Sequence, residues 1–416
     1  MKHSLFQPLL LVLLLGTCVR AQSLDSLRAE LRREHPELRA LQLEYRAAQQ
    51  MGAQQDQLPD LEIGAGVFVL PVQTRTGPQQ FRVGATQMLP WPGKLAAMAA
   101  VADARARPLL ERVAARQLEL LYQLDRAYYA LAGTEARAAV LRESLDVYAS
   151  LDQLTLRRVE AGTGSSVDVY RIQLQRQQVE RRLAELANRA QREMVTINRL
   201  LDRPTDTQIE PEAELATEVA EVLDFAPDLA ADDPDLANHP ALRFYELQSE
   251  ANRAAIELND LDRRPDFGVG LDYIATGRRT DVELPGNGRD VLLPRAMVRI
   301  PLSQRKYTAK RQEETLRIEA LTARREATER AFRAELRRAL LTIDDAANEL
   351  LFLGEQARVI EATLAVARGE FANNRRAFDE LLRLENQLID YQVRAVMSRT
   401  AILLERATID RYLLNN

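Results

Sequence analysis

The sequence predicts a mainly helical protein built from two copies of one unit, with four short β-strands that form a separate part. Three observations predict this class. Aromatic residues make up only 5% of the 416 residues and charged residues 28%, a composition typical of long packed helices. The phrase HPELRALQLEYRAAQQ at residues 35–50 returns as HPALRFYELQSEANRA at residues 239–254. After each copy come two segments of alternating hydrophobicity and then a very long helical stretch.

The N-terminus has the pattern of a secretory signal peptide at residues 1–21. Lys2 precedes an apolar run that is too short to cross a bilayer as a helix, and small residues precede Ala21. We therefore expect export of the chain and cleavage after Ala21. An alternative is that LGTC is a lipoprotein processing site that leaves Cys18 acylated, although Thr17 fits that site poorly. Cys18 is the only cysteine, so the mature chain would contain no disulfide.

The duplication divides the chain into a first repeat at residues 22–203 and a second repeat at residues 235–416. Between them, residues 204–234 contain no Lys or Arg, many acidic residues and several prolines. This composition predicts an acidic linker, or equatorial segment, that crosses the outside of the structure.

The predicted helix lengths suggest how the helices pack. The long helix of the first repeat, at about residues 94–160, would span on the order of 100 Å at 1.5 Å per residue. Shorter helices at about residues 24–56 and 167–201 together supply nearly the same length, so they can stack end to end and run antiparallel beside it. The second repeat has the corresponding helices at about residues 303–373, 235–261 and 377–414.

Each repeat contributes two strands, so four are expected, at about residues 60–70, 80–89, 266–274 and 295–302. In each of them apolar side chains alternate with small or polar ones, as Ile63 does with Gly64. Their length suits a tilted strand that spans a membrane. Four strands cannot close a barrel and open edges are not tolerated in lipid, so the chain would have to oligomerise. The alternative is a small soluble sheet made by a single chain.

Trp91 is the only tryptophan, and it lies in the sequence MLPWPGK at the end of a predicted strand. A membrane-spanning sheet would use it as an aromatic anchor at the membrane interface. A rigid corner between strand and helix, framed by the two prolines, is an equally good explanation of the same sequence.

The stretch RRVEAGTGSSVDVYRIQ at residues 157–173 predicts the tip of a helical hairpin. Gly162 and Gly164 follow a helix that carries two arginines in its last turn, a pattern typical of a glycine-terminated helix. Ser165 or Ser166 can cap the next helix, with Asp168 in its first turn.

Taken together, the duplication, the strand pairs, this tip, the corner QMLPWPGK and the segment NRLLDRP resemble the TolC-like outer membrane efflux protein family over essentially the whole mature chain. The resemblance implies a homotrimer with a 12-stranded outer membrane β-barrel and a long periplasmic α-barrel of coiled-coil hairpins. It also implies a periplasmic adaptor, an inner membrane transporter and outer membrane lipid as partners. The expected adaptor contact is the tip with residues Gly162, Thr163, Gly164, Ser165, Ser166 and Asp168.

The second hairpin tip departs from the family pattern. Asn374 stands where the first tip has Gly162, and Arg376 is added. The family often carries acidic rings near its periplasmic entrance, so we expect the gate in a set of five residues: Asn374, Arg376, Asp379, Glu380 and Arg383. Three copies of an inward-facing Glu380 would favour cations. Alternatively, its carboxylate and that of Asp379 only stabilise a helix N-terminus.

No arrangement typical of an enzyme, a cofactor site or a metal site is recognisable. His35 and His239 occupy equivalent positions before a proline at a helix start, which favours a capping role over metal binding. The sequence Gly162-Thr-Gly164 lacks the lysine of a phosphate-binding loop and follows a helix. No nucleophile has a base partner and no basic tract suggests nucleic acid, so we expect neither enzymatic activity nor nucleic-acid binding.

The function that these features favour is a passive exit duct for small molecules or metal ions, delivered by an inner membrane transporter through an adaptor. The same architecture would serve as the outlet of a type I protein secretion system. A periplasmic coiled-coil adaptor or scaffold protein, from a different class, would share the leader and the hairpins but not four amphipathic strands.

Overall fold

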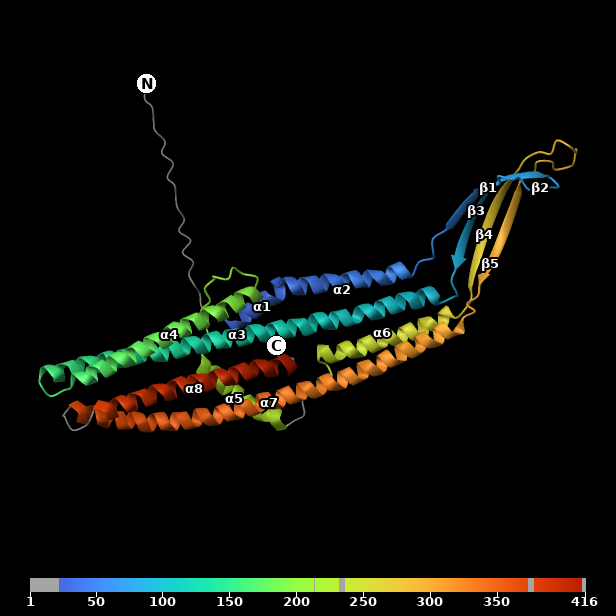
Figure 1. Cartoon of the computed structure of the whole chain (residues 1–416). Coiled ribbons are helices and arrows are strands. Elements are labelled where there is room, and N and C mark those ends of the chain that lie inside the picture. The colour runs from blue at the N-terminus through green and yellow to red at the C-terminus, as the bar shows by residue number, and fades with distance from the viewer. Residues whose placement is uncertain (1–21, 213, 232–235, 373–377, 414–416) are drawn as a thin grey trace, which may run out of the picture.

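The computed structural model describes residues 22–212, 214–231, 236–372 and 378–413. The molecule is elongated, with a small β-sheet at one end and helices that extend to the opposite end (Figure 1). The expected signal peptide with Cys18, and the second-tip residues Asn374 and Arg376, lie outside the described residues.

Two helices, α1 (Leu24–Glu34) and α2 (Pro36–Gln55), occupy the stretch where a single helix was expected. The expectation was wrong because the chain breaks at His35, whose backbone is extended. The imidazole Nδ1 of His35 accepts a hydrogen bond from the Glu37 N–H at 3.2 Å, and Pro36 begins the new helix. His239 does the same at the equivalent position of the second repeat, where it accepts from the Ala241 N–H.

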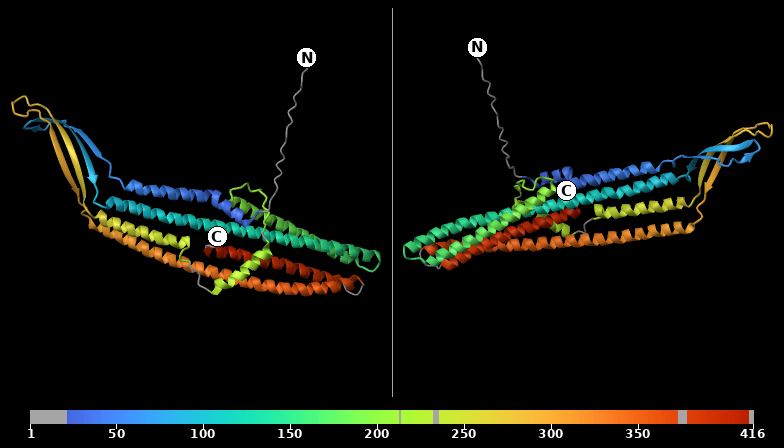
Figure 2. Two further views of the ribbon diagram at one scale, coloured as in Figure 1. Left: turned by 180° about the vertical axis from the view of Figure 1, so that it is seen from behind. Right: turned by 45° about the horizontal axis from the view of Figure 1, so that its top comes forward.

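Two very long helices run the length of the helical part, and shorter helices stack end to end beside them (Figures 1 and 2). The long helix α3 (Lys94–Glu160) contacts α2, α4 (Ser166–Leu200), α6 (Pro240–Asp262) and α8 (Phe378–Leu413). The second long helix, α7 (Gln304–Ala372), contacts α6 and α8. The chain therefore forms a curved layer in which α3 is internal, while α7 lies at one edge and α2 and α4 at the other.

The acidic segment between the repeats contains a helix of its own, α5 (Leu215–Ala231). It packs against α8 and α7 and crosses the side of the helical layer (Figure 1). Its Leu215, Val219 and Val222 are buried in the main core. Apolar residues at these helical spacings let the linker dock although it contains no basic residue.

That main core lies midway along the helices, where α1, α3, α5, α7 and α8 meet. Tyr128 ties several segments together there, because its hydroxyl donates to the Gln22 carbonyl and accepts from the Glu212 N–H, each at 2.9 Å. One turn away, the buried carboxylate of Asp125 accepts two hydrogen bonds from the Arg28 guanidinium, at 2.8 and 2.9 Å. Among the described residues, no helix carries a stretch long and apolar enough to cross a lipid bilayer.

The sheet is antiparallel, with strand order β1-β3-β4-β5 and a short additional strand, β2, paired with β3. Its strands are β1 (Glu62–Val67), β2 (Gln73–Thr74), β3 (Gly77–Leu89), β4 (Asp266–Thr276) and β5 (Val291–Arg299). The central pair, β3 and β4, joins the two repeats, so β1 and β5 are left as the edges.

Several strand boundaries differ from the expected ones, and those of the second and fourth strands have identifiable causes. The second strand was expected from residue 80 but β3 begins at Gly77, because the preceding segment folds back as β2 and pairs with it. The fourth was expected at 295–302 but β5 runs from Val291 to Arg299, with Pro294 inside it. An edge strand tolerates a proline because one side of it makes no ladder hydrogen bonds.

Candidate functional site

One face of the sheet is apolar and exposed. The strand register places the apolar residues of neighbouring strands side by side, with Ala65 opposite Val83, Val83 opposite Tyr273 and Phe267 opposite Val298. Ile63 is 72% exposed on this face and Val298 54%. A water-soluble sheet buries such a face against a core, so this face requires a partner or a lipid environment.

The opposite face carries glycines and one compact charge cluster. The carboxylate of Asp272 is fully buried and lies 2.5 Å from Arg82 and 2.6 Å from Arg295. Gly84 leaves the space for it, since a Cβ at this position would lie 1.9 Å from the Asp272 Oδ1. The cluster joins three strands and both repeats, so no pattern within a single strand could have revealed it.

Aromatic pairs lie at both ends of the apolar face. At the helical end, Trp91 stacks on Phe267 with ring centroids 6.0 Å apart, and the Arg264 guanidinium lies 5.9 Å from the Trp91 ring. At the far end, Phe81 and Tyr273 lie 6.2 Å apart. The two β4 aromatics are six residues apart along the strand, or about 20 Å. Aromatic side chains at both borders of an apolar face are typical of strands that span a membrane.

Trp91 also lies at the corner where the strand turns into α3. Its backbone N–H donates to the Asp266 Oδ1 at 3.2 Å, and Lys94 forms ion pairs with Asp262 at 3.1 Å and Asp266 at 3.3 Å. These contacts tie the start of α3 to the junction between α6 and β4. The corner is thus rigid and at the same time presents an aromatic ring at the edge of the apolar face.

The first hairpin tip is a tight turn between α3 and α4. Gly162 has a φ of 72°, a conformation that favours glycine, and the Thr163 N–H donates to the Arg158 carbonyl at 2.8 Å. Gly164 passes close to the preceding turn, since a Cβ there would lie 2.9 Å from the Arg158 Cβ. Ser165 caps α4 by accepting from the Val167 N–H at 3.2 Å, and Ser166 is the first helical residue.

Arg158 connects this tip to the end of α7. Its guanidinium lies 4.2 Å from the Phe371 ring centroid and donates to the Phe371 carbonyl at 3.1 Å. It also donates to the Thr163 carbonyl inside the tip at 3.3 Å. Phe371 in turn lies 5.7 Å from Phe378, the first residue of α8. The two hairpin ends therefore lie against each other.

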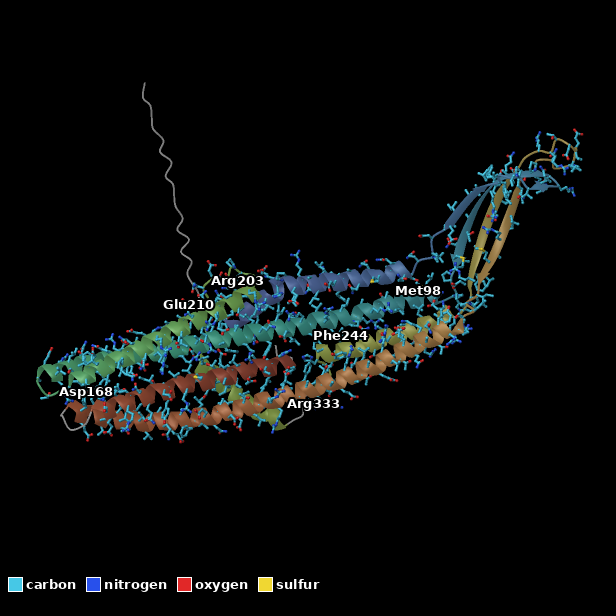
Figure 3. The ribbon with its side chains drawn as sticks, viewed as in Figure 1. Met98, Asp168, Arg203, Glu210, Phe244 and Arg333 are labelled. Carbon is cyan, nitrogen blue, oxygen red and sulfur yellow. The ribbon has the colours of Figure 1, made fainter. Side chains whose placement is uncertain are left out.

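Asp168 and Asp379, assigned from sequence to different tips, are both within reach of one arginine. The Arg171 guanidinium forms an ion pair with Asp379 and lies 3.8 Å from Asp168. Asp168 is at the end of the molecule opposite the sheet (Figure 3). Burial, and secondly the negative charge of Asp379, raise the pKa of the Asp168 carboxyl. Sequence reasoning missed Arg171, because an arginine on an exposed helix face has no local signature.

The other gate candidates lie at the start of α8. The Glu380 side chain is half-buried and that of Arg383 is exposed. One turn further on, the almost fully buried Glu385 accepts two hydrogen bonds from Arg368 of α7, at 2.7 and 2.9 Å. This pair holds α7 against α8 directly behind the tip and was also missed, since its members are on two different helices.

A shallow apolar pocket of about 320 Å³ lies among α2, α3 and α6, with Met51, Met98 and Leu258 in its lining. Met98 is near the sheet end of α3 (Figure 3). In the part of the chain that the structure describes, no three His, Cys, Asp or Glu side chains are grouped so that they could hold a metal ion.

Comparisons with known proteins agree with this geometry. The model of a family described as outer membrane efflux protein matches residues 27–203. CusC, described in connection with transmembrane channel formation, has a TM-score of 0.74 at 14% identity, over 94% of this chain and 91% of that chain. VceC, an outer membrane protein from Vibrio cholerae, has a TM-score of 0.72 at 15% identity, over 94% and 95%. A search of curated proteins finds no sequence that matches significantly.

A third similar structure is the open state of the MtrE outer membrane channel of Neisseria gonorrhoeae, with a TM-score of 0.71 at 16% identity, over 94% of this chain and 88% of that chain. At such identities these structures establish the shared fold. The family model covers nearly all of the first repeat, and the second repeat has the same architecture. Residues 27–203 are therefore similar to the outer membrane efflux protein family, and the chain as a whole shares the fold of these outer membrane channels.

Proposed function

We propose that this protein is the passive exit duct of a tripartite efflux system, formed by three copies of the chain. The observation that carries the proposal is the sheet, with an exposed apolar face, a charge cluster on the opposite face and two unpaired edges. Lipid would cover the apolar face, and the charged face would line the lumen. Three copies would supply twelve strands, enough to close a barrel in which no edge is exposed to lipid.

The helical layer also has unpartnered apolar side chains at its two lateral edges. On α4, near the tip, Tyr170 is 64% exposed and Leu174 is 58% exposed. On α7, Phe352, Val359 and Val366 are exposed and recur every seven residues. This is the spacing of a coiled-coil seam, so these two edges suit each other when α7 of one subunit packs beside α4 of the next.

The repeat symmetry predicts how the subunits pair their strands. Within the first repeat Ile63 is opposite Ala85, and their counterparts Val269 and Ala296 are opposite each other in the second. The two strands within each repeat are therefore paired in the same register in both repeats. Across the junction between the repeats, Thr86 is opposite Gly270. In the other repeat, Met297 of β5 corresponds to Thr86 of β3, and Gly64 of β1 corresponds to Gly270 of β4. If neighbouring subunits meet as the two repeats do, Met297 of one subunit should lie opposite Gly64 of the next.

The two ends of the trimer would then have different roles. The sheet end is in the outer membrane, and the hairpin tips are on the order of 100 Å away in the periplasm. The tip from Gly162 to Asp168 contacts the adaptor. Residues 374–383 form the gate, through which small molecules or metal ions from the inner membrane transporter enter the tunnel.

A disulfide cross-link tests the trimer and its register. Since the only cysteine is Cys18 in the leader, the variant Gly64→Cys/Met297→Cys introduces the only thiols of the mature chain. A side chain at Gly64 has open space around it. We expect oxidation to yield covalent dimers and trimers in outer membrane fractions. The control Gly64→Cys/Leu293→Cys moves one thiol four residues, about 13 Å, along the strand and should not cross-link.

Planar bilayer recording tests the channel itself. The purified wild-type protein should migrate as a heat-modifiable trimer and conduct ions across the bilayer. A soluble periplasmic monomer that neither cross-links nor conducts would exclude the channel and favour a scaffold protein.

A further inference from the structure

We propose that a basic pocket at the junction of sheet and helices binds the phosphate group of a membrane phospholipid. The pocket has a volume of about 480 Å³ and is lined by Asp260, Arg263, Arg264, Gln304 and Arg311. It lies where α6 ends, β4 begins and α7 starts. The proposal rests on the proposed function, because it requires the apolar sheet face to be in a membrane.

The charges of the pocket favour an anion. Three of its five lining side chains are guanidinium groups and one is a carboxylate. That carboxylate, Asp260, forms an ion pair with Arg311. Arg263 donates its Nε–H to the Gln304 Oε1 at 3.0 Å, which orients its guanidinium without neutralising it. Over the described ranges of the chain, neither Arg263 nor Arg264 forms an ion pair with a carboxylate.

The start of α7 adds to the positive potential. Gln304 is the first residue of α7, so the positive end of a 69-residue helix faces this region. Arg305 and Lys306 follow it, and both are exposed. Guanidinium groups bind phosphate oxygens through paired, charge-assisted hydrogen bonds, so two unpaired arginines beside a helix N-terminus suit a phosphate.

The position of the pocket identifies the source of the phosphate. Arg264 lies over the ring of Trp91, and Trp91 stacks on Phe267, the first aromatic residue of the exposed apolar face. The pocket is thus at the helical border of that face. A lipid whose acyl chains cover the apolar face would bring its headgroup to this border, whereas a free phosphate ion would gain nothing from the adjoining aromatic pair.

Native mass spectrometry of the purified full chain tests the proposal. Phosphatidylglycerol or phosphatidylethanolamine is titrated into the protein in detergent, with diacylglycerol as the lipid that lacks phosphate. The variant Arg263→Gln/Arg264→Gln removes the two unpaired guanidinium groups. The matched control Arg324→Gln/Arg338→Gln removes two exposed arginines of α7 far from the pocket.

We expect the double variant to bind both phospholipids about tenfold more weakly than the wild type, a loss in the range of charged hydrogen bonds. The control variant should bind like the wild type. The variant Arg263→Lys/Arg264→Lys keeps the charge and should recover part of the affinity. Diacylglycerol should bind the wild type and the glutamine variant equally weakly.

Equal phospholipid binding by the glutamine variant and its control would overturn the proposal. So would equal affinity of the wild type for diacylglycerol and phospholipid. Inorganic phosphate that competes at the concentration of the phospholipid would show that the site takes free phosphate and not a lipid. If the proposed membrane position is itself wrong, the wild type will bind no lipid of any kind and will not conduct, which separates that failure from failure of the pocket.

Discussion

Arg171 of α4 forms an ion pair with Asp379 of α8 and so ties one hairpin tip to the other. Both side chains are about half or more exposed, and Asp168 of the first tip lies close to the same guanidinium. In a channel that is gated at this end, the pair would resist the separation of the two hairpins. It is therefore a good place to test how the tips move.

Removal of the arginine should open the tip. We expect Arg171→Gln to raise the open probability in planar bilayers up to about fivefold, because an exposed ion pair contributes up to about 1 kcal/mol. Asp379→Asn should give a similar increase, and the double variant should add little to either. Arg181→Gln, which removes an ion pair within α4 alone, is the control. Fully additive effects would show that Arg171 and Asp379 act separately.

Acid pH should favour the closed tip. The pKa of Asp168 is raised by burial and by Asp379, while Arg171 and Arg158 act in the opposite direction. The tip in this conformation thus binds a proton more tightly than a tip in which Asp168 is exposed and Asp379 is distant. The resulting stabilisation of the closed tip is present below the pKa of the exposed carboxyl and is lost as the pH rises through the raised pKa.

We expect conductance to fall between about pH 7 and pH 4, where an aspartate with a raised pKa titrates. Asp168→Asn should flatten this dependence, because the side chain then no longer titrates. The exposed carboxylate of Asp146 on α3 offers a matched control, and Asp146→Asn should leave the pH profile as it is. A profile unchanged by Asp168→Asn would assign the pH dependence to other groups.

A β-branched residue at Gly162 should weaken adaptor docking but leave the trimer assembled. Its φ of 72° costs a β-branched residue roughly 1–2 kcal/mol, so the turn would have to rearrange. Photo-cross-linking from the tip to the adaptor in cells measures the effect, and we expect Gly162→Val to lose most of the cross-linked product. Gly354→Val, at a helical glycine with open space around it, serves as the control. Cross-linking at wild-type efficiency would contradict the adaptor role of this tip.

Loss of the Asp272 carboxylate should destabilise the sheet. Asp272→Ala leaves Arg82 and Arg295 facing each other without a counter-ion, and we expect a cost of about 2 kcal/mol. This is less than for a fully buried pair, since both arginines are partly exposed. The temperature at which the trimer dissociates on heating measures the change. Asp281→Asn removes an exposed loop ion pair and should leave that temperature nearly unchanged.

The charge at the entrance should influence ion selectivity. If Glu380 lines the pore, three copies of its carboxylate attract cations, so Glu380→Gln should lower the cation preference measured from reversal potentials in asymmetric salt. Arg383→Gln should shift the preference in the opposite direction. An unchanged reversal potential for Glu380→Gln would show that its side chain does not face the pore.

Patterns within short segments determined which parts of the structure could be predicted. The alternation of Ile63, Ala65 and Val67 with glycines identified the apolar face of β1, and the structure has these three residues on one side of the sheet. The glycines of the first tip likewise predicted its turn. In both cases the information lies within a few neighbouring residues.

Contacts between distant segments could not be predicted in this way. The cluster of Asp272 with Arg82 depends on the register between two strands that are 190 residues apart in the chain. The pair of Arg171 and Asp379 joins residues 208 apart. Nothing in either local sequence specifies its partner, because many exposed charges on helices and strands have the same local pattern. The capping role of His35 was recognisable from the proline that follows it, but the residues before it were not separated as a helix of their own.

The pairing of β3 with β4 also bears on how such a chain could have arisen. Each repeat supplies one hairpin of two strands, and the junction between the repeats has the same antiparallel form as the contact expected between subunits. A gene that encoded only one repeat could therefore have closed the same barrel from six identical chains. Fusion of two such genes would have halved the number of subunits. It would also have freed the two tips to diverge, and they now differ, with Gly162 in one where the other has Asn374 followed by two arginines.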